Sequence, residues 1–279
     1  MQVKSPIEQL LFATVRITTK VPGGTGRGTG FVFQADIDET HSALVVVTNK
    51  HVIEGASEVE LHFIRSTPDG QSPLLGQEFV VSCSPTSFFG HSDPDIDVAA
   101  LGIGGTVDQL KAQGVRLFYR SIPAEYAATP AALENFEPIE PVTFIGYPNG
   151  LFDTSSLLPI VRRGHAATAL SVDYEGRPVF LIDASVFPGS SGSPVFLYVP
   201  ASVPDKHGNI NLGLGPQLLF LGVVAAVHQR AVPVLQTSAH SIPYVNELLD
   251  IGVVYKASTV LETVQGMIDQ HQARQAGSN

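Results

Sequence analysis

Three short segments of the sequence carry side chains that could do chemistry together. In the first, an apolar, strand-like run ends at His51. In the second, Asp97 enters another apolar run, and in the third, Ser191 lies in a turn with Gly189 before it and Gly192 after it. Each segment alone has an ordinary explanation, as a structural histidine, a turn aspartate or a flexible loop. Glycines on both sides of one serine, however, let the backbone turn sharply and direct successive amides at one point.

Taken together, the three residues meet the needs of nucleophilic acyl transfer. Serine is a weak nucleophile unless a base takes its proton, and the base needs a carboxylate to fix its tautomer. Here Ser191 would attack, His51 would move the proton, and a buried Asp97 would accept a hydrogen bond from the imidazole. The oxyanion that forms needs fixed N–H donors. We expect the backbone amides of Gly189 and Ser191 to supply them.

The composition argues against several other classes of protein. The chain has 16 basic and 26 acidic residues and a net charge of −10, and no basic cluster is longer than Arg162-Arg163, so no nucleic-acid partner is expected. No run approaches the roughly 20 apolar residues of a membrane span. The nine histidines are scattered without a metal-ligand spacing, and the glycine-rich run 23–30 matches no nucleotide-binding motif. We therefore predict no metal and no cofactor.

Cysteine usage and the N-terminus both indicate a reducing compartment. Cys83 is the only cysteine, so no intramolecular disulfide can form, and its apolar surroundings predict a buried strand rather than a reactive thiol. The apolar part of the segment 8–15 is too short for the core of a signal peptide. We expect a cytoplasmic protein.

Short apolar runs separated by Gly, Pro, Asn or Asp recur along the chain, which is typical of an all-β sandwich or barrel. The predicted strands are 13–18, 30–33, 43–48, 59–64, 78–83, 98–101, 142–145, 179–182, 194–198, 218–227 and 252–255. Their distribution predicts four parts: a β unit over 1–104, a connection over 105–140, a second β unit over 141–256, and a helix with a tail over 257–279. The connection includes a short helix over 107–112, and the segment 200–216 is expected to be an exposed loop.

The period of the apolar residues changes after Tyr255. Five apolar residues (Val260, Leu261, Val264, Met267 and Ile268) recur at the intervals of one helical face. Thr259 and Glu262 have the spacing of a capping box. We expect an amphipathic helix of roughly three to four turns that packs on its own domain.

The segments Thr48–Ile53, Asp97–Leu101 and Gly189–Pro194 resemble the three signatures of the trypsin/chymotrypsin family of serine proteases. The style is that of its bacterial trypsin-like branch, which includes the HtrA/Deg proteases. The order His, Asp, Ser along the chain is also that family's, and Gly28–Val32 resembles its glycine-rich turn. The resemblance covers roughly residues 10–256. It implies an all-β, chymotrypsin-like double six-stranded β-barrel, here with a C-terminal α-helix, and a serine endopeptidase acting on proteins or peptides through an acyl-enzyme.

The resemblance also assigns roles near the nucleophile. Ser190 stands where digestive relatives carry an Asp that pairs with a new N-terminus, so we predict no activation by N-terminal cleavage. Ser185 is placed at the floor of the specificity pocket and Val186 beside it, which predicts cleavage after small or aliphatic residues. Asp183 has the same facing as Ser185, so a preference for basic residues stays open.

Two further expectations concern the substrate groove and the end of the chain. The strand 222–227, with Ala225 and Ala226, should offer a backbone edge to an extended substrate. Too few residues follow the second barrel for the PDZ domain of many HtrA-type proteins. The sequence leaves two alternatives open, a pseudoprotease that binds peptides on the same fold and a serine esterase, and it leaves the oligomeric state undetermined.

Overall fold

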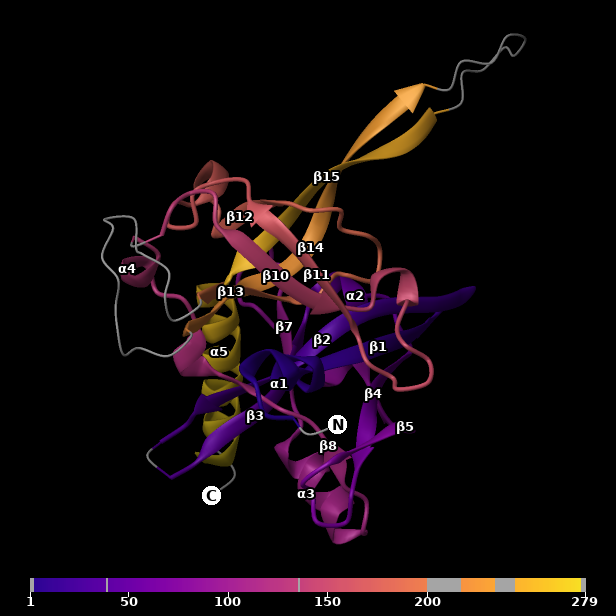
Figure 1. Ribbon diagram of the computed structural model, residues 1–279. Helices are drawn as coiled ribbons and strands as arrows, with labels where there is room; N and C mark the ends of the chain where they lie inside the picture. The colour runs from indigo at the N-terminus through magenta and orange to yellow at the C-terminus, as the bar shows by residue number, and fades with distance from the viewer. Residues whose placement is uncertain (1–2, 39, 135, 200–216, 234–243, 277–279) are drawn as a thin grey trace, which may run out of the picture.

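The computed structural model describes residues 3–38, 40–134, 136–199, 217–233 and 244–276. Two β units follow one another along the chain, and a long C-terminal helix stands against them (Figure 1). The predicted exposed loop 200–216 lies outside the described residues.

The first β unit is a sheet of nine strands within the described residues, in the order β5-β4-β1-β2-β3-β7-β6 with β8 beside β4 and β9 beside β2. Its strands are β1 (Thr14–Val21), β2 (Gly24–Asp36), β3 (Ser42–Thr48), β4 (Glu58–Ser66), β5 (Pro73–Cys83), β6 (Phe89–Gly90), β7 (Ala99–Gly102), β8 (Leu117–Phe118) and β9 (Ile122–Pro123). The six strands predicted for this unit are β1 to β5 and β7, and the sheet also contains three strands of two residues each, β6, β8 and β9.

The second β unit is a closed barrel of six strands, as predicted, in the order β10-β11-β12-β15-β14-β13. These strands are β10 (Pro141–Gly146), β11 (Ile160–Ala166), β12 (Val179–Asp183), β13 (Pro194–Val199), β14 (Gln217–Pro233) and β15 (Tyr244–Lys256). The far parts of β14 and β15 leave the barrel together as a two-stranded ribbon (Figure 1).

Helices and turns complete the chain. The α-helices are α1 (Pro6–Ala13), α2 (Lys50–Ile53), α3 (Gly104–Ala112), α4 (Pro130–Leu133) and α5 (Ala257–Ala276), and 3₁₀ turns lie at Pro85–Ser87, Ala124–Tyr126, Pro148–Gly150 and Tyr174–Gly176. Helix α3 confirms the helix expected in the connection. No helix of the described residues is long and apolar enough to cross a membrane.

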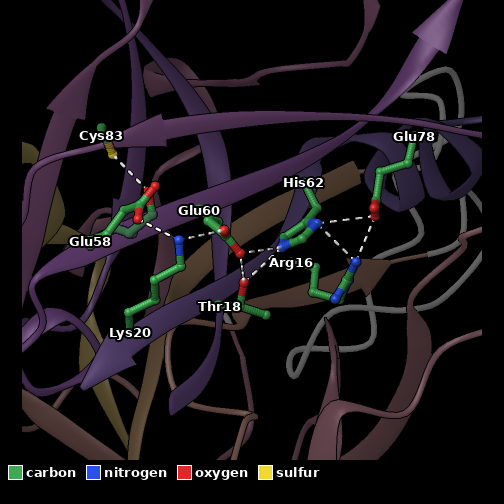
Figure 2. A network of polar contacts seen from close by, with 9 residues as sticks. Arg16, Thr18, Lys20, Glu58, Glu60, His62, Glu78 and Cys83 are labelled. Atoms are coloured by element: carbon green, nitrogen blue, oxygen red, sulfur yellow. Dashed lines mark hydrogen bonds and ion pairs between the residues drawn. The ribbon is translucent and has the colours of Figure 1, made fainter. Parts of the chain in front are cut away.

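The strands of the first sheet form where apolar and polar residues alternate. Along β4, Val59 and Leu61 are fully buried, while Glu58, Glu60 and His62 alternate with them on the opposite face. On that face they meet side chains of β1 and β5 in a network of hydrogen bonds and ion pairs (Figure 2). One face of the sheet therefore contributes to the core and the other is held by polar contacts.

A single apolar core joins the two β units. Phe31 and Phe33 of β2 pack against Phe220 of β14, with ring centroids 5.3 and 5.8 Å apart, and Phe196 of β13 completes the cluster. Burial of four aromatic rings stabilises the junction strongly. This common core fixes the position of one β unit relative to the other where the two are in contact.

Helix α5 differs from the helix that the sequence predicted. It has 20 residues and begins at Ala257, so it is longer than three to four turns. Val260, Val264 and Ile268 are buried in the common core, as their spacing predicted. The predicted capping box was wrong, because the helix begins two residues before Thr259. The Thr259 hydroxyl instead donates to the carbonyl of Lys256 at 2.8 Å.

Candidate active site

His51 lies in α2, directly after β3. The helix has a single turn, and Val52 and Ile53 anchor it because both are buried. The His51 side chain keeps 44% of its surface exposed. Asn49, at the start of this turn, is fully buried, and its Nδ2 donates to the carbonyl of Asp97 at 2.6 Å. The buried end of β3 thus places an exposed imidazole at the surface.

Asp97 lies between two buried residues, Ile96 and Val98, just before β7. Its Oδ2 is 2.5 Å from His51 Nδ1, and its Oδ1 accepts the backbone N–H of His51 at 3.0 Å. The structure therefore joins two of the three predicted residues through two hydrogen bonds. Asp97 is 26% exposed rather than buried.

The turn that carries Ser191 depends on its two glycines. Gly189 and Gly192 both have φ of +88°, a conformation that side chains with a Cβ rarely adopt. A Cβ at Gly192 would also collide with the carbonyl oxygen of Thr29 and lie 2.7 Å from Thr48 Oγ1. Since Thr48 is three residues before His51, this close packing brings the serine turn beside the histidine turn.

The Ser191 hydroxyl does not meet His51 in this structure. Its Oγ donates to the carbonyl of Ala225 on β14 at 3.1 Å, and among the described residues no hydrogen bond joins it to the imidazole. The structure thus brings His51 and Asp97 into direct contact and places Ser191 against the strand expected to bind substrate.

The amides of Gly189 and Ser191 have no acceptor among the described residues. The carbonyl of Pro188 accepts the N–H of Asn149 at 2.6 Å, and the carbonyl of Ser190 accepts the N–H of Ser193 at 3.0 Å. A trans peptide bond holds its C=O and N–H on opposite sides, so each of the two amides points away from these contacts. This orientation suits donors for an oxyanion.

Ser190 and the predicted pocket residues differ in their surroundings. Ser190 is 1% exposed, and its Oγ has no hydrogen-bond partner among the described residues. Val186 is buried in the barrel core, where a Cβ on Gly252 would lie 2.7 Å from its Cγ2. Ser185 is partly exposed and lines an open hollow. The charged or polar residues around that hollow are Arg162, Arg163, His165, Asp183, Ser185 and Asp250.

Arg162 packs between aromatic rings next to this hollow. Its guanidinium carbon lies 4.9 Å from the centroid of the Phe187 ring and 5.6 Å from that of Phe144. Burial lowers the pKa of Arg162. Its positive charge therefore lies against Phe187, four residues before the nucleophile.

The edge of β14 next to Ser191 is free of strand pairing. Val224 donates to the carbonyl of Ser193 and accepts from Gly192. Beyond Val224, the described part of the chain pairs β14 only with β15, where Ala226 lies opposite Val253. Ala225 is buried, and its carbonyl holds the Ser191 hydroxyl.

Two residues important for the geometry of the site were not singled out from the sequence. They are Thr29, whose N–H donates to the carbonyl of Ser191 at 2.9 Å, and Asn149, which has φ of +51° and holds Pro188. The position of Thr29 between two glycines was a signal for the first. For the second, Asn149-Gly150 is a turn signal, but it does not show which peptide the turn holds.

Other candidate sites in the described residues are weak. No group of three or more His, Cys, Asp or Glu residues there could hold a metal ion. Cys83 ends β5 and donates to the carbonyl of Val59, and burial raises the pKa of its thiol to about 11. Such a thiol is a poor nucleophile at neutral pH.

Comparison with known proteins gives a family and a fold. The family model described as a trypsin-like peptidase domain matches residues 28–198. A serine endoprotease from Yersinia pestis is similar in structure, with 16% identity, a TM-score of 0.50, and coverage of 96% of this chain and 68% of that one. The active form of the Rv3671c protease from M. tuberculosis has 20% identity and a TM-score of 0.48, covering 94% of this chain and 84% of that one. A search of curated protein sequences gives no match.

Proposed function

The chain belongs to the trypsin-like peptidase family and is a serine-type endopeptidase, and from that premise we propose that Ser191 is its nucleophile, His51 its base and Asp97 the group that orients the base. The contact of 2.5 Å between His51 Nδ1 and Asp97 Oδ2 supports these roles most directly. An ionised carboxylate can only accept a hydrogen bond, so Nδ1 carries the proton and Nε2 offers its lone pair.

The proposed reaction runs in two halves. Ser191 Oγ attacks the scissile carbonyl while its proton passes to His51 Nε2, and the amides of Gly189 and Ser191 hold the oxyanion. The C–N bond then breaks, and the proton moves from Nε2 to the leaving amine. Water attacks the acyl-enzyme by the same route and releases the acid and a free Ser191.

Substrate binding would also turn the Ser191 hydroxyl from Ala225 toward His51. A peptide added along the edge of β14 can donate a backbone N–H to the carbonyl of Ala225. That donor competes with the Ser191 hydroxyl for the same oxygen. The released hydroxyl would then be free to rotate toward His51, and side-chain rotation is fast. Hydrogen bonds of a catalytic site are often completed only in the complex.

We expect cleavage after small or aliphatic residues. Neither Ser185 nor Val186 carries an acid that would pair with a Lys or Arg side chain, and Val186 is buried in the barrel core. Arg162 and Arg163 line the hollow at Ser185 and disfavour another positive charge, although Asp183 and Asp250 line it too. Profiling with a peptide library tests this preference, and a profile dominated by Lys or Arg at P1 would contradict it.

Activity should not require N-terminal cleavage. Ser190 cannot form an ion pair with an ammonium group, and the neighbouring peptides are held instead by Asn149 and Thr29. Full-length protein is therefore expected to hydrolyse peptides as synthesised. Inert full-length protein that becomes active on clipping near residue 20 would be evidence against this.

A fluorophosphonate probe tests the assignment of the nucleophile. The wild type should be labelled on Ser191, Ser191→Ala should not be labelled, and Ser190→Ala should retain labelling as the neighbouring control. A folded wild type that resists the probe would favour a peptide-binding pseudoprotease. A labelled enzyme that cleaves esters but no peptide would favour the esterase.

A further inference from the structure

Thr29 on β2 makes four hydrogen bonds around the nucleophile turn, although it belongs to the other β unit. Its N–H donates to the carbonyl of Ser191 at 2.9 Å. Its hydroxyl donates to the carbonyl of Gly189 at 2.8 Å and accepts the N–H of Tyr147 at 3.1 Å. Its carbonyl accepts the hydroxyl of Thr48 at 2.7 Å. The residue is fully buried, so water does not compete for these contacts.

The hydroxyl of Thr29 fixes the peptide that follows Gly189. Gly189 has no Cβ to restrict it, and at φ of +88° its neighbouring peptide planes can rotate more freely than those of other residues. The hydrogen bond from Thr29 Oγ1 fixes the plane on the C-terminal side of Gly189. The N–H of Ser190, in the same peptide, donates to the carbonyl of Phe187 at 2.9 Å, so without the Thr29 bond this plane would be held from one side only.

The same hydroxyl also acts on the peptide that precedes Gly189. It accepts the N–H of Tyr147 and so places the turn Pro148–Gly150, in which Asn149 donates to the carbonyl of Pro188 at 2.6 Å. That carbonyl shares a peptide bond with the Gly189 amide. One buried oxygen therefore controls both planes around Gly189, directly on one side and through the Tyr147 turn on the other.

The chemistry of this position requires a hydroxyl. The oxygen must donate to a carbonyl and accept from an amide at once, which a hydroxyl can do and a methyl group cannot. Valine has nearly the same shape but would leave the carbonyl of Gly189 and the N–H of Tyr147 without a partner. We propose that Thr29 is a positioning residue for the oxyanion hole, holding the Gly189 amide in the direction that stabilises the tetrahedral intermediate. This inference rests on the proposed function.

The test compares Thr29→Val, Thr29→Ser and a matched control, Thr19→Val. Thr19 lies on the adjacent strand β1 and is 1% exposed, and in the part of the chain that the structure describes its hydroxyl has no hydrogen-bond partner. Thr29→Val should lower kcat about 10- to 100-fold with KM little changed, since loss of a whole oxyanion donor costs about 10²–10³. Thr29→Ser and Thr19→Val should stay within about twofold of the wild type, the scatter expected where no oxyanion donor is disturbed.

A peptide boronic acid separates positioning from general stability. Its tetrahedral adduct with the serine places an oxygen where the oxyanion would form, so Thr29→Val should weaken inhibition by the same factor as it lowers kcat. If Thr29→Val does not fold, Thr29→Cys replaces it, because a thiol is a much weaker donor and acceptor in a similar volume. Its kcat should lie below that of Thr29→Ser, and a folded Thr29→Cys with the kcat of the wild type would contradict the inference.

Three results would overturn the inference: a folded Thr29→Val with the kcat of the wild type, equal losses in Thr29→Ser and Thr29→Val, or a loss carried by KM alone. Failure of the proposed function gives a different result. In that case the wild type itself would neither react with a fluorophosphonate nor be inhibited by the boronic acid, whatever residue stands at position 29.

Discussion

Asp97 controls both the ring and the backbone of His51. One carboxylate oxygen contacts Nδ1 and the other accepts the N–H of the same residue. The second contact fixes the start of α2, so the carboxylate sets the position of the imidazole as well as its tautomer. Asn49 adds a bond to the carbonyl of Asp97 and ties the two turns together.

Replacing this carboxylate tests the role of Asp97. Asp97→Asn should preserve the fold and lower kcat by roughly 10⁴, because an amide that donates to Nδ1 selects the wrong tautomer. Steady-state cleavage of a peptide substrate measures the loss. Asp95→Asn is the control, because Asp95 lies two residues from Asp97 and its side chain is exposed. It should leave kcat unchanged. Equal effects of the two substitutions would contradict the assignment.

The sequence predicted the residues with distinctive chemistry and not those that position them. His51, Asp97 and Ser191 could be proposed because their types, glycine neighbours and order follow from a mechanism. Thr29 and Asn149 act through backbone contacts with residues 160 and 39 positions away (189 − 29 and 188 − 149). The contact of Thr29 depends on how the two β units dock, and that of Asn149 on how the turn Pro148–Gly150 meets the serine turn. No local pattern encodes either contact.

At the scale of elements, most strands followed from alternating or continuous apolar runs, and the misses have local causes. Strand β11 was not predicted because Arg162, Arg163 and Gly164 interrupt its apolar pattern. Helix α1 was also missed, although a signal was present: the Ser5 hydroxyl accepts the N–H of Glu8, and the Glu8 carboxylate accepts the N–H of Ser5. A capping box before a short apolar run is enough to predict a helix.

The outer face of β1 and β4 makes stability depend on pH. Arg16 Nη2 lies 2.9 Å from His62 Nδ1, Glu78 lies 3.1 Å from the same nitrogen, and Glu60 lies near the other (Figure 2). Burial is the main cause that lowers the pKa of His62 from 6.5, and the charge of Arg16 lowers it further. Below pH 6.5 the unfolded chain therefore binds a proton more readily than the folded chain.

The free energy of unfolding should consequently fall as the pH drops from 6.5 through the lowered pKa of His62. Above pH 6.5 this group should contribute its full stabilisation. Urea unfolding of the wild type and His62→Gln across this range measures the effect, and the variant should show a weaker pH dependence. His271→Gln, exposed on α5, is the control. A variant with the same pH dependence as the wild type would exclude His62 as the cause.

At the scale of the whole molecule, the site depends on the contact between the two β units. His51 and Asp97 come from the first unit and Ser191 from the second, and the aromatic cluster around Phe220 lies in the core that joins them. Helix α5 packs on strands of both units, contacting β3, β6 and β7 as well as β14 and β15. The relative position of the catalytic residues is therefore a property of this common core.

Loss of the central ring should destabilise the protein as a whole. Phe220 is fully buried and contacts three other aromatic rings. Phe220→Ala should lower the free energy of unfolding by about 3–5 kcal/mol, from lost burial and the cavity that remains. Ile139→Ala, at a position 73% exposed, should change it by less than about 0.5 kcal/mol. Chemical unfolding measures both, and similar values would contradict the central place of Phe220.

Peptide cleavage by the wild type and Ser191→Ala tests the central claim most directly. Both proteins are incubated with a peptide library, and new carboxyl termini are identified by mass spectrometry. The wild type should generate new termini, enriched in small or aliphatic residues, and Ser191→Ala should reduce their rate of formation by roughly 10⁶, as loss of a catalytic serine does elsewhere. Cleavage at equal rates by both proteins, or no cleavage by the folded wild type, would contradict the account.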